Sequence, residues 1–505
     1  MKVAPRAVAP ASLAAIFILA AASYWGGLGP GDGERYIEAA LRWQQGPFLG
    51  DTHWALRHLF VLPMAALFTL IGPSELVAIL PNVAYAVLTV AVTWAFGRRY
   101  LGRHEAFLAA AFVATSAFFV ARPFELDVYG AEAFFAALSC WLFVGAREGG
   151  GRRWLVAAGL TAGLAWTVRE QALCLIVAFG LLILHSRKDV LRSLVFLGIG
   201  FGFVIAAELA IYAVASGDPF YRYRIDLGHR DIGVGAALPP ERSGLPGRAL
   251  EALKYMATTP ATTPMLLMAA GALYYLRQAQ IRLAPLAISA LRVFGAAAGV
   301  SAILTPLAFN LAWTRYYPML TYAAFLVVAV AIASLWTSSR KRAAAGAVFA
   351  VLAVNIAAAD FTRDGDYAEA RALARMAMTS HEAIYADPLT VSRARYQLRL
   401  KGWSMAAASE KVRNVRDATA GSLVFGTERT EAPAGPSCTT AKLTLRKTGW
   451  THALLRETGI SRLLGARAEA IAARPRPVRV MRLLDSPATA DPESGAPCIN
   501  RGSRD

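Results

Sequence analysis

Acidic residues collect in two short segments of an otherwise apolar chain. The segment "PGDGERYIEAALRW", residues 30–43, follows the first long apolar run and contains Asp32 and Glu34. The segment "RPFELDVYGAEAFF" contains Glu125 and Asp127. Because a carboxylate within hydrogen-bonding reach can take a proton from a hydroxyl or an amine, both segments are candidates for general-base chemistry.

Two further segments place arginine beside acidic or aromatic residues. The segment "WTVREQALC" contains Arg169 and Glu170, and "NLAWTRYYPML" contains Arg315 and Tyr316. A planar guanidinium binds phosphate oxygens through paired hydrogen bonds. Carboxylates and guanidinium groups together fit the transfer of a sugar from a phosphate-linked donor, in which a carboxylate activates the acceptor and a cation stabilises the departing phosphate.

Each candidate also has a purely structural interpretation. Asp32 could be the N-cap of a helix that runs through "GERYIEAALRW". Glu125 and Asp127 could be loop charges in water, and Arg169 could form an ion pair with the glutamate that follows it. Arg315 could anchor the chain at a membrane interface beside the neighbouring tyrosines. These alternatives stay open at the level of the sequence.

The two acidic pairs could also chelate a metal ion. Asp32 and Glu34 are separated by one residue, as are Glu125 and Asp127, and carboxylate oxygens are the hard ligands that divalent cations prefer. Phosphate is already a good leaving group, so one base suffices for the transfer. The expected reaction therefore requires no cofactor, and binding of a divalent cation by these carboxylates stays an alternative.

The composition indicates a protein with several membrane-spanning helices. Of the 505 residues, 56% are hydrophobic and 17% are charged, and apolar runs of about twenty residues recur. The formal net charge is +18. In a membrane protein such an excess of Lys and Arg is first a topology signal. Since no aromatic-basic motif for RNA or DNA appears, no nucleic-acid partner is expected.

The apolar runs predict about eleven membrane crossings. Every second loop between the runs is basic, as in "GRRYLGRH", "REGGGRR" and "SSRKR". The positive-inside rule therefore places these loops and the N-terminus in the cytoplasm, and the C-terminus outside. The short, proline-containing run at 58–72 is interpreted as an interfacial or re-entrant helix. The predicted crossings are 7–28, 76–96, 105–121, 131–146, 154–168, 171–185, 193–215, 263–276, 287–309, 320–336 and 343–359.

Two domains follow from this pattern. Residues 1–359 form the membrane domain, with a first external loop at 29–75 and a fourth at 216–262. Residues 360–505 are polar and Arg-rich, and "EAIYAD", "GSLVFG" and "RPVRVMRLL" have strand character while "PLTVSRARYQLRLKG" and "THALLRETGISRLLGARAEAIAAR" have helix character. We expect a small extracytoplasmic α/β domain in which Cys438 and Cys498 could pair.

All the candidate segments then fall on the outer side of the membrane, at the ends of four different external loops. Ionisable groups near the hydrocarbon are costly, and they mark functional sites by default. We therefore expect a site on the periplasmic or extracellular face of a bacterial-type inner (plasma) membrane.

At these residues the chain resembles the membrane-embedded GT-C glycosyltransferases, in particular the protein O-mannosyltransferase and aminoarabinose-transferase group. In that family a Pro-Asp-Glu-x-x-Tyr run opens the first external loop, and "PGDGERYIEA" matches it with Asp32 on the family's catalytic Asp. The departures are the inserted Gly31 and Gly33 in place of the usual Glu, for which Glu34 could compensate. The resemblance implies the GT-C fold and Asp32 as the catalytic base.

The later motifs of the family match less closely. "ELDVYGAEAFFAAL" places Asp127 on an Asp that precedes an aromatic-rich helix, without the usual Asp-x-Pro, and "GLAWTVRE" places Arg169 where the family has Lys. "TRYYPML" is similar to its Arg-Tyr-x-x-Pro segment, so Arg315 and Tyr316 become donor-site candidates. The resemblance implies a polyprenyl-phosphate-linked sugar donor and a lipid, glycan or protein acceptor.

Two other functions fit parts of the sequence. A lipid or solute transporter would be favoured by internal repeats and by charges near the middle of the membrane, and neither is found in the sequence. A catalytically inactive GT-C-like scaffold is favoured by the replaced Glu and the missing Asp-x-Pro. The identity of the sugar and of the acceptor cannot be read from residue spacing.

Overall fold

A computed structural model describes most of the chain. The described residues are 5–25, 28, 32–46, 49–121, 124, 126–186, 189–227, 244–259, 262–309, 316–338, 340–362, 366–427, 430, 437–443 and 478–483. They divide into two compact units. The first comprises residues 1–26, 39–70 and 78–362, and the second comprises residues 27–38, 71–77 and 363–505.

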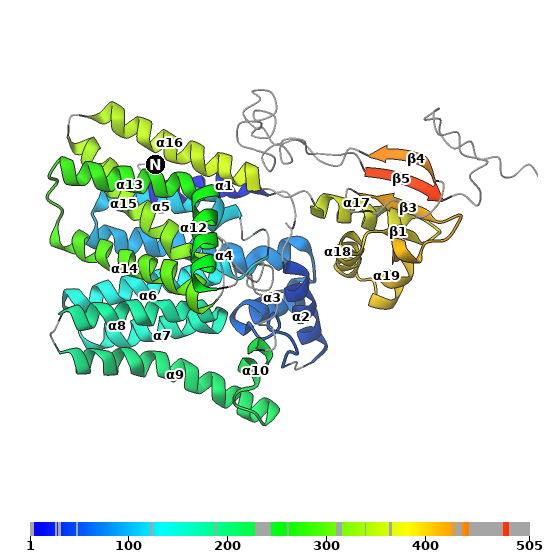
Figure 1. Cartoon of the computed structure of the whole chain (residues 1–505), viewed down its shortest axis with the longest axis horizontal. Coiled ribbons are helices and arrows are strands. Elements are labelled where there is room, and N and C mark those ends of the chain that lie inside the picture. Colours follow the sequence, from blue (N-terminus) through cyan, green and yellow to red (C-terminus); the bar gives the residue numbers. More distant parts are fainter. Residues whose placement is uncertain are drawn as a thin grey trace, which may run out of the picture. The chain divides into compact units, whose positions relative to one another are not determined.

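The first unit is a helical bundle (Figure 1). Its helices are joined mostly by short turns. They are α1 (Pro5–Tyr24), the later part of α2 (Gly33–Gln45), α3 (His58–Ile71), α4 (Glu75–Tyr100), α5 (Arg103–Thr115), η1 (Ala117–Ala121), α6 (Tyr129–Gly145), η3 (Ala146–Gly150), α7 (Arg152–Val168), η4 (Glu170–Ala172), α8 (Leu173–Ser186), α9 (Val190–Ser216), α10 (Tyr221–Leu227), α12 (Leu245–Thr258), α13 (Thr263–Gln278), α14 (Pro285–Ala308), α15 (Pro318–Thr337) and α16 (Lys341–Thr362).

Each of the predicted apolar runs overlaps helical residues of this bundle, with the runs at 105–121 and 171–185 each divided between two helices. Within the described residues, six helices are long and apolar enough to cross a membrane, namely those at 75–100, 129–150, 190–216, 285–308, 318–337 and 341–359. Helices α1, α3 and α8 are apolar but shorter. An apolar helix is favoured in lipid because it satisfies all its backbone hydrogen bonds internally. The chain is therefore a multi-pass membrane protein, and the number of crossings stays a prediction.

Small residues bring α7 and α9 into direct backbone contact. A Cβ atom added at Gly159 would meet the carbonyl oxygen of Leu197, and one added at Gly200 would meet that of Val156. Close approach at glycine is a common way of packing helices in lipid, where no hydrophobic effect drives them together. This contact fixes α7, whose C-terminal end leads into Arg169.

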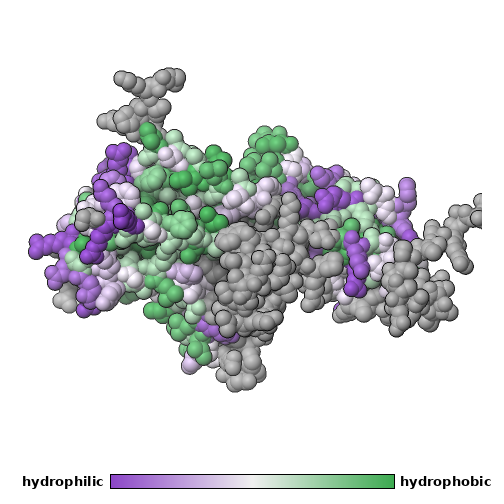
Figure 2. Space-filling view, turned by 90° about the horizontal axis from the view of Figure 1, so that it is seen from above, coloured by the Kyte–Doolittle hydropathy of each residue, from purple (hydrophilic) through white to green (hydrophobic). Residues whose placement is uncertain are grey.

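The basic turns gather at one end of the bundle. The C-terminal ends of α13 and α15 and the N-terminal ends of α14 and α16 lie together at the left in Figure 1. Arg277 closes α13, and Lys341 and Arg342 open α16. Hydrophilic side chains cover the same end in Figure 2, while hydrophobic side chains cover much of the visible flank. This separation is what the positive-inside rule requires of cytoplasmic turns.

The second unit contains an α/β domain, as predicted. Its five-stranded sheet has the order β2-β1-β3-β5-β4, with β1 parallel to β2 and β3 and with β5 antiparallel to β3 and β4. Ile384, Val412 and Phe425 form its core with Leu373 and Leu398 of the covering helices. The elements are α17 (Asp366–Thr379), β1 (Ile384–Ala386), α18 (Pro388–Arg399), α19 (Met405–Lys411), β2 (Val412–Asn414), η8 (Val415–Asp417), β3 (Leu423–Gly426), β4 (Ser437–Leu443) and β5 (Val478–Leu483).

The three predicted strands correspond to β1, β3 and β5, and the helix predicted after residue 387 is α18. Asp387 caps α18 by accepting a hydrogen bond from the Thr390 backbone N–H at 3.0 Å. Strands β2 and β4 were not predicted, and the helix predicted at 451–474 lies outside the described residues. Cys438 on β4 is disulfide-bonded, and Cys498 lies outside the described residues.

Candidate active site

Arg169 lies in a buried aromatic clamp in the first unit. It follows the last residue of α7, and the Arg169 guanidinium carbon lies 4.4 Å from the ring centroids of both Tyr129 and Tyr316. Only 7% of Arg169 is exposed. Because the face of an aromatic ring attracts a cation, the two rings hold the guanidinium in place from two adjacent sides.

A glutamate that was not among the predicted candidates faces this arginine. Glu132 Oε2 lies 3.6 Å from Arg169 Nη1, which is too long for a hydrogen bond. Neither of the two atoms has a hydrogen-bond partner. Arg169 therefore pairs with Glu132 rather than with its neighbour Glu170, and one N–H of its guanidinium remains available to an oxyanion.

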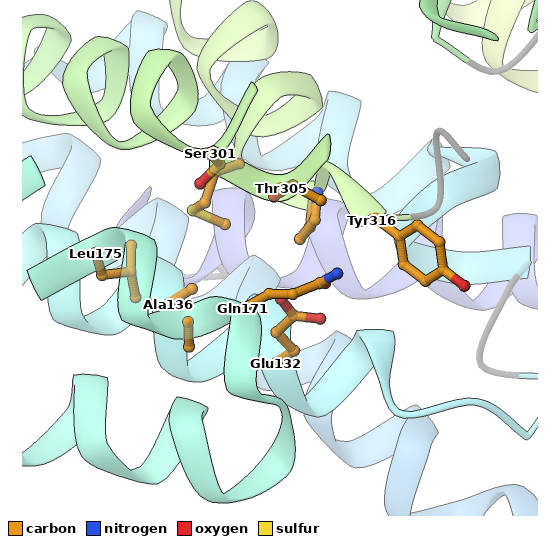
Figure 3. Close-up of a pocket in the computed structure, with 10 residues that line it drawn as sticks. Glu132, Ala136, Gln171, Leu175, Ser301, Thr305 and Tyr316 are labelled. Carbon is orange, nitrogen blue, oxygen red and sulfur yellow. The ribbon is translucent and has the colours of Figure 1, made fainter. Parts of the chain in front are cut away.

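A small polar cavity adjoins this pair (Figure 3). Its walls include Glu132 on α6, Gln171 on η4, Ser301 and Thr305 on α14, and Tyr316. Figure 3 shows the side chains of Gln171 and Glu132 lying close together in the cavity. The space open to the centre of a water molecule is about 10 Å³, which is room for about one water. Both polar atoms of the Gln171 amide lack a partner, so the cavity offers unpaired donors as well as acceptors.

Asp127 is buried next to the clamp and is tied to the backbone there. Its Oδ1 accepts a hydrogen bond from the Tyr129 N–H at 2.9 Å, and its carbonyl oxygen accepts one from Asn82 Nδ2 at 2.8 Å. Only 7% of the residue is exposed. The alternative that Asp127 is a loop charge in water is wrong, because the side chain holds the beginning of α6 and with it Tyr129.

Glu170 belongs to a second ion-pair cluster, centred on Arg222 of α10. Arg222 is 1% exposed and forms salt bridges with Glu170, with Glu208 at 2.6 Å and with Asp226 at 3.2 Å. It also donates to the Thr167 carbonyl oxygen at 3.0 Å. The cluster joins α7, α9 and α10 and thereby holds the turn that carries Arg169.

Burial changes the acidity of Asp226 in this cluster. Burial and the nearby charge of Glu170 together raise the pKa of Asp226 to about 7, against the opposing charges of Arg222 and Arg57. Three carboxylates surround a single Arg222, so one of them holds a proton most readily. Asp226 therefore titrates near neutral pH.

Asp32 and Glu34 belong to the second unit. Asp32 immediately precedes α2, and its carbonyl oxygen accepts the first helical hydrogen bond, from the Arg35 N–H at 2.9 Å. This is the N-cap position that was considered for Asp32. Burial raises the pKa of Glu34, and the charges of Arg393 and Arg35 lower it. Glu34 thus lies in the charge environment of α18.

Two of the predicted site residues cannot be located. Glu125 and Arg315 lie outside the described residues. Within the described ranges, no group of three or more His, Cys, Asp or Glu residues could hold a metal ion. The divalent cation therefore stays an open alternative.

The sequence contained a signal for the residue that was missed. Glu132 is an ionisable side chain inside the apolar helix that begins at Tyr129, and such residues are rare in membrane helices unless they are paired or functional. Gln171 gives no comparable signal, because its importance comes from the cavity it faces. The tertiary structure alone brings it next to Glu132.

The sequence and the fold are similar to known glycosyltransferases. Residues 59–212 match the family model described as dolichyl-phosphate-mannose-protein mannosyltransferase. No curated protein sequence matches the chain. The Archaeoglobus fulgidus oligosaccharyltransferase in complex with Zn and sulfate is similar at a TM-score of 0.50 and 14% identity, over 79% of this chain and 62% of that one. The chain therefore spans less than two thirds of the length of that enzyme.

A bacterial structure is similar over almost its whole length. ArnT from Cupriavidus metallidurans in the apo state gives a TM-score of 0.53 at 12% identity, over 95% of this chain and 98% of that one. The same protein bound to undecaprenyl phosphate gives 0.52 at 13% identity, over 94% and 97%. The resemblance predicted from the acidic motifs is confirmed, and the chain has the GT-C fold of membrane glycosyltransferases.

Proposed function

We propose that this protein is an integral membrane glycosyltransferase that moves a sugar from a polyprenyl-phosphate-linked donor to an acceptor on the periplasmic or extracellular face. The observation that carries the proposal is the Arg169 clamp. In a GT-C fold, a buried guanidinium held against Tyr129 and Tyr316, with an unpaired N–H beside a polar cavity, is suited to a phosphate oxygen. The complex of ArnT with undecaprenyl phosphate supports a lipid phosphate as the ligand.

The roles of the residues follow from the chemistry of the transfer. Asp32 takes the proton from the acceptor, and Arg169, Arg315 and Tyr316 hold the donor phosphate. Asp127, with Glu125, orients the acceptor or binds a divalent cation. The charge that develops on the departing phosphate oxygen is stabilised by the guanidinium groups, so a separate general acid is not needed.

The disulfide and the charge distribution support the proposed orientation. Disulfides persist in oxidising compartments, and Cys438 of the C-terminal domain is disulfide-bonded. The basic helix ends lie together at one end of the bundle, as expected of cytoplasmic turns. We assign the C-terminal domain to the periplasmic or extracellular side and the N-terminus to the cytoplasm of a bacterial-type inner (plasma) membrane.

Turnover by purified protein in nanodiscs tests the function. A panel of polyprenyl-phosphate sugars is supplied with candidate lipid, glycan and peptide acceptors, and loss of the donor is followed by mass spectrometry. We expect the wild type to consume one donor and Asp32→Asn to consume none. The matched control is Asp51→Asn, which removes a carboxylate that is 63% exposed and paired only with the exposed Arg42 in the described structure; it should retain at least half of the activity.

The other outcomes separate the remaining functions. An Asp32→Asn variant with wild-type turnover would remove Asp32 from the mechanism. A donor that binds to the wild type and is not consumed would favour a catalytically inactive scaffold. If no lipid phosphate binds, transport of a lipid or solute is the function to test next.

A further inference from the structure

The site around Arg169 contains its own negative charge. Glu132 is 4% exposed and Arg169 is 7% exposed, and the 3.6 Å between Oε2 and Nη1 leaves both atoms without a hydrogen bond. Removing one partner of a buried ion pair leaves an uncompensated charge, which is strongly unfavourable. Glu132 is therefore the counter-charge of Arg169, while the unused hydrogen-bonding capacity of Arg169 remains open to a ligand.

The neighbouring side chains keep this arrangement rigid. The rings of Tyr129 and Tyr316 both lie against the guanidinium, each 4.4 Å from its carbon, and their centroids are 6.1 Å apart, so they hold it in place from two adjacent sides. Gln171 has an unpaired amide that adjoins Glu132 in the cavity. Arg57 and Glu170 also act on Glu132 through their charges, in opposite directions. An anion that binds Arg169 thus enters a place where a carboxylate is already present.

We propose that Glu132 makes the Arg169 site selective for a singly charged phosphodiester over a doubly charged phosphomonoester. This inference rests on the proposed function, because it gives the site a lipid phosphate as its ligand. A polyprenyl-phosphate sugar is a diester with one negative charge, whereas polyprenyl phosphate is a monoester whose second proton is lost near pH 6. The second charge is repelled by Glu132 in a medium of low dielectric constant.

The selectivity distinguishes the product of the transfer from the donor at this site. During transfer the bond between the anomeric carbon and the phosphate oxygen breaks, and the electron pair remains on that oxygen. The acceptor oxygen or nitrogen forms the new bond to the anomeric carbon, and its proton passes to the base. The lipid thereby changes from diester to monoester and gains one negative charge, so Glu132 favours release of the product over release of the donor.

Binding of two matched lipids to the full-length protein in nanodiscs tests the inference. The probes are a short-chain polyprenyl monophosphate and the methyl diester of the same lipid, so that the contribution of the tail cancels in the ratio of the two dissociation constants. At pH 8 we expect the wild type to bind the diester at least tenfold more tightly. In Glu132→Gln the ratio should fall close to one, because the monoester binds more tightly.

Glu251→Gln is the matched control, because it neutralises another carboxylate, 13% exposed, that pairs with Lys254 of α12 instead; its ratio should equal that of the wild type. Equal binding of the two lipids by the wild type, or an unchanged ratio in Glu132→Gln, would overturn the inference. If Glu132→Gln does not fold, the two dissociation constants of the wild type are measured at pH 5.5 instead. The monoester is then mainly singly charged, so the preference for the diester should largely disappear. A preference for the diester that persists at pH 5.5 contradicts the inference. Failure of both lipids to bind at either pH would instead refute the proposed donor.

Discussion

The C-terminal domain holds the helix that follows Asp32 through a strong ion pair. In the second unit, Glu38 Oε2 on α2 lies 2.6 Å from Arg399 Nη1 on α18, and the two side chains are only 20% and 14% exposed. Glu34, one turn earlier on the same helix, lies in the field of Arg393. The acidic motif and the C-terminal domain therefore form one folded unit.

The coupling energy of this pair can be set against that of an exposed pair in the same unit. Hydrogen bonds to charged groups contribute about 1.5–3 kcal/mol when they are largely buried, whereas exposed ion pairs contribute about 0.2–1 kcal/mol. We expect about 2 kcal/mol between Glu38 and Arg399. Arg482 and Glu382 have the same 2.6 Å separation but are 43% and 45% exposed, so their coupling should be well below 1 kcal/mol.

Double-mutant cycles measure both couplings. The variants Glu38→Gln, Arg399→Met and their combination are compared with Glu382→Gln, Arg482→Met and their combination by thermal unfolding in detergent. Each kcal/mol corresponds to about 2–4 °C for a unit of this size, so Arg399→Met should lower the Tm by roughly 4–8 °C. If the coupling of Glu38 and Arg399 does not exceed that of the exposed control pair, the anchoring of α2 by the domain is refuted.

Three further predictions concern the helical unit. Gly200→Ala should destabilise the protein by about 1–3 kcal/mol, because the added Cβ would meet the backbone of α7. Gly198→Ala is the control, because a Cβ added there meets nothing within 4 Å. Equal unfolding temperatures of the two variants would contradict the close contact. The pKa of Asp226 is raised to about 7, so Asp226 stabilises the fold fully below pH 4 and loses that contribution as the pH rises through 7. The fall in Tm between pH 5 and pH 8 should therefore be smaller in Asp226→Asn than in the wild type. A fall as large as in the wild type would exclude Asp226 as its source. Arg169→Lys should weaken binding of polyprenyl monophosphate about tenfold, because an ammonium lacks the planar fork that binds phosphate through paired hydrogen bonds. Arg152→Lys, at the opposite end of α7, should leave the dissociation constant unchanged. Wild-type affinity in Arg169→Lys would remove the guanidinium from the phosphate site.

The apolar periodicity of the sequence determined the helices, because a backbone in lipid has to satisfy its hydrogen bonds within the segment. It predicted helices at all the expected crossings and also the short α3, whose 14 residues distinguish it from the longer helices. It also predicted β1, β3 and β5, whose residues alternate or run apolar. Strands β2 and β4 were missed because β2 has three residues and β4 is largely polar.

Residue type likewise singled out Arg169 and Asp127 from the sequence, since ionisable groups beside apolar runs are costly to keep without a role, and the family resemblance added Tyr316. The sequence could not assign their partners. Arg169 was considered as a partner of its neighbour Glu170, yet the backbone turns at Arg169 and sends the two side chains to different clusters, one with Glu132 and the other with Arg222.

The sequence by itself thus determined the class of fold, the membrane location and most of the residues that could do chemistry, because these depend on hydrophobicity and residue type along short stretches. Only the tertiary structure decided which charges meet. Glu132 is 37 positions from Arg169 in the sequence, and the two come together because α6 and α7 pack side by side and leave both side chains buried. A pairing of this kind depends on the packing of whole helices, which no local pattern of residues encodes.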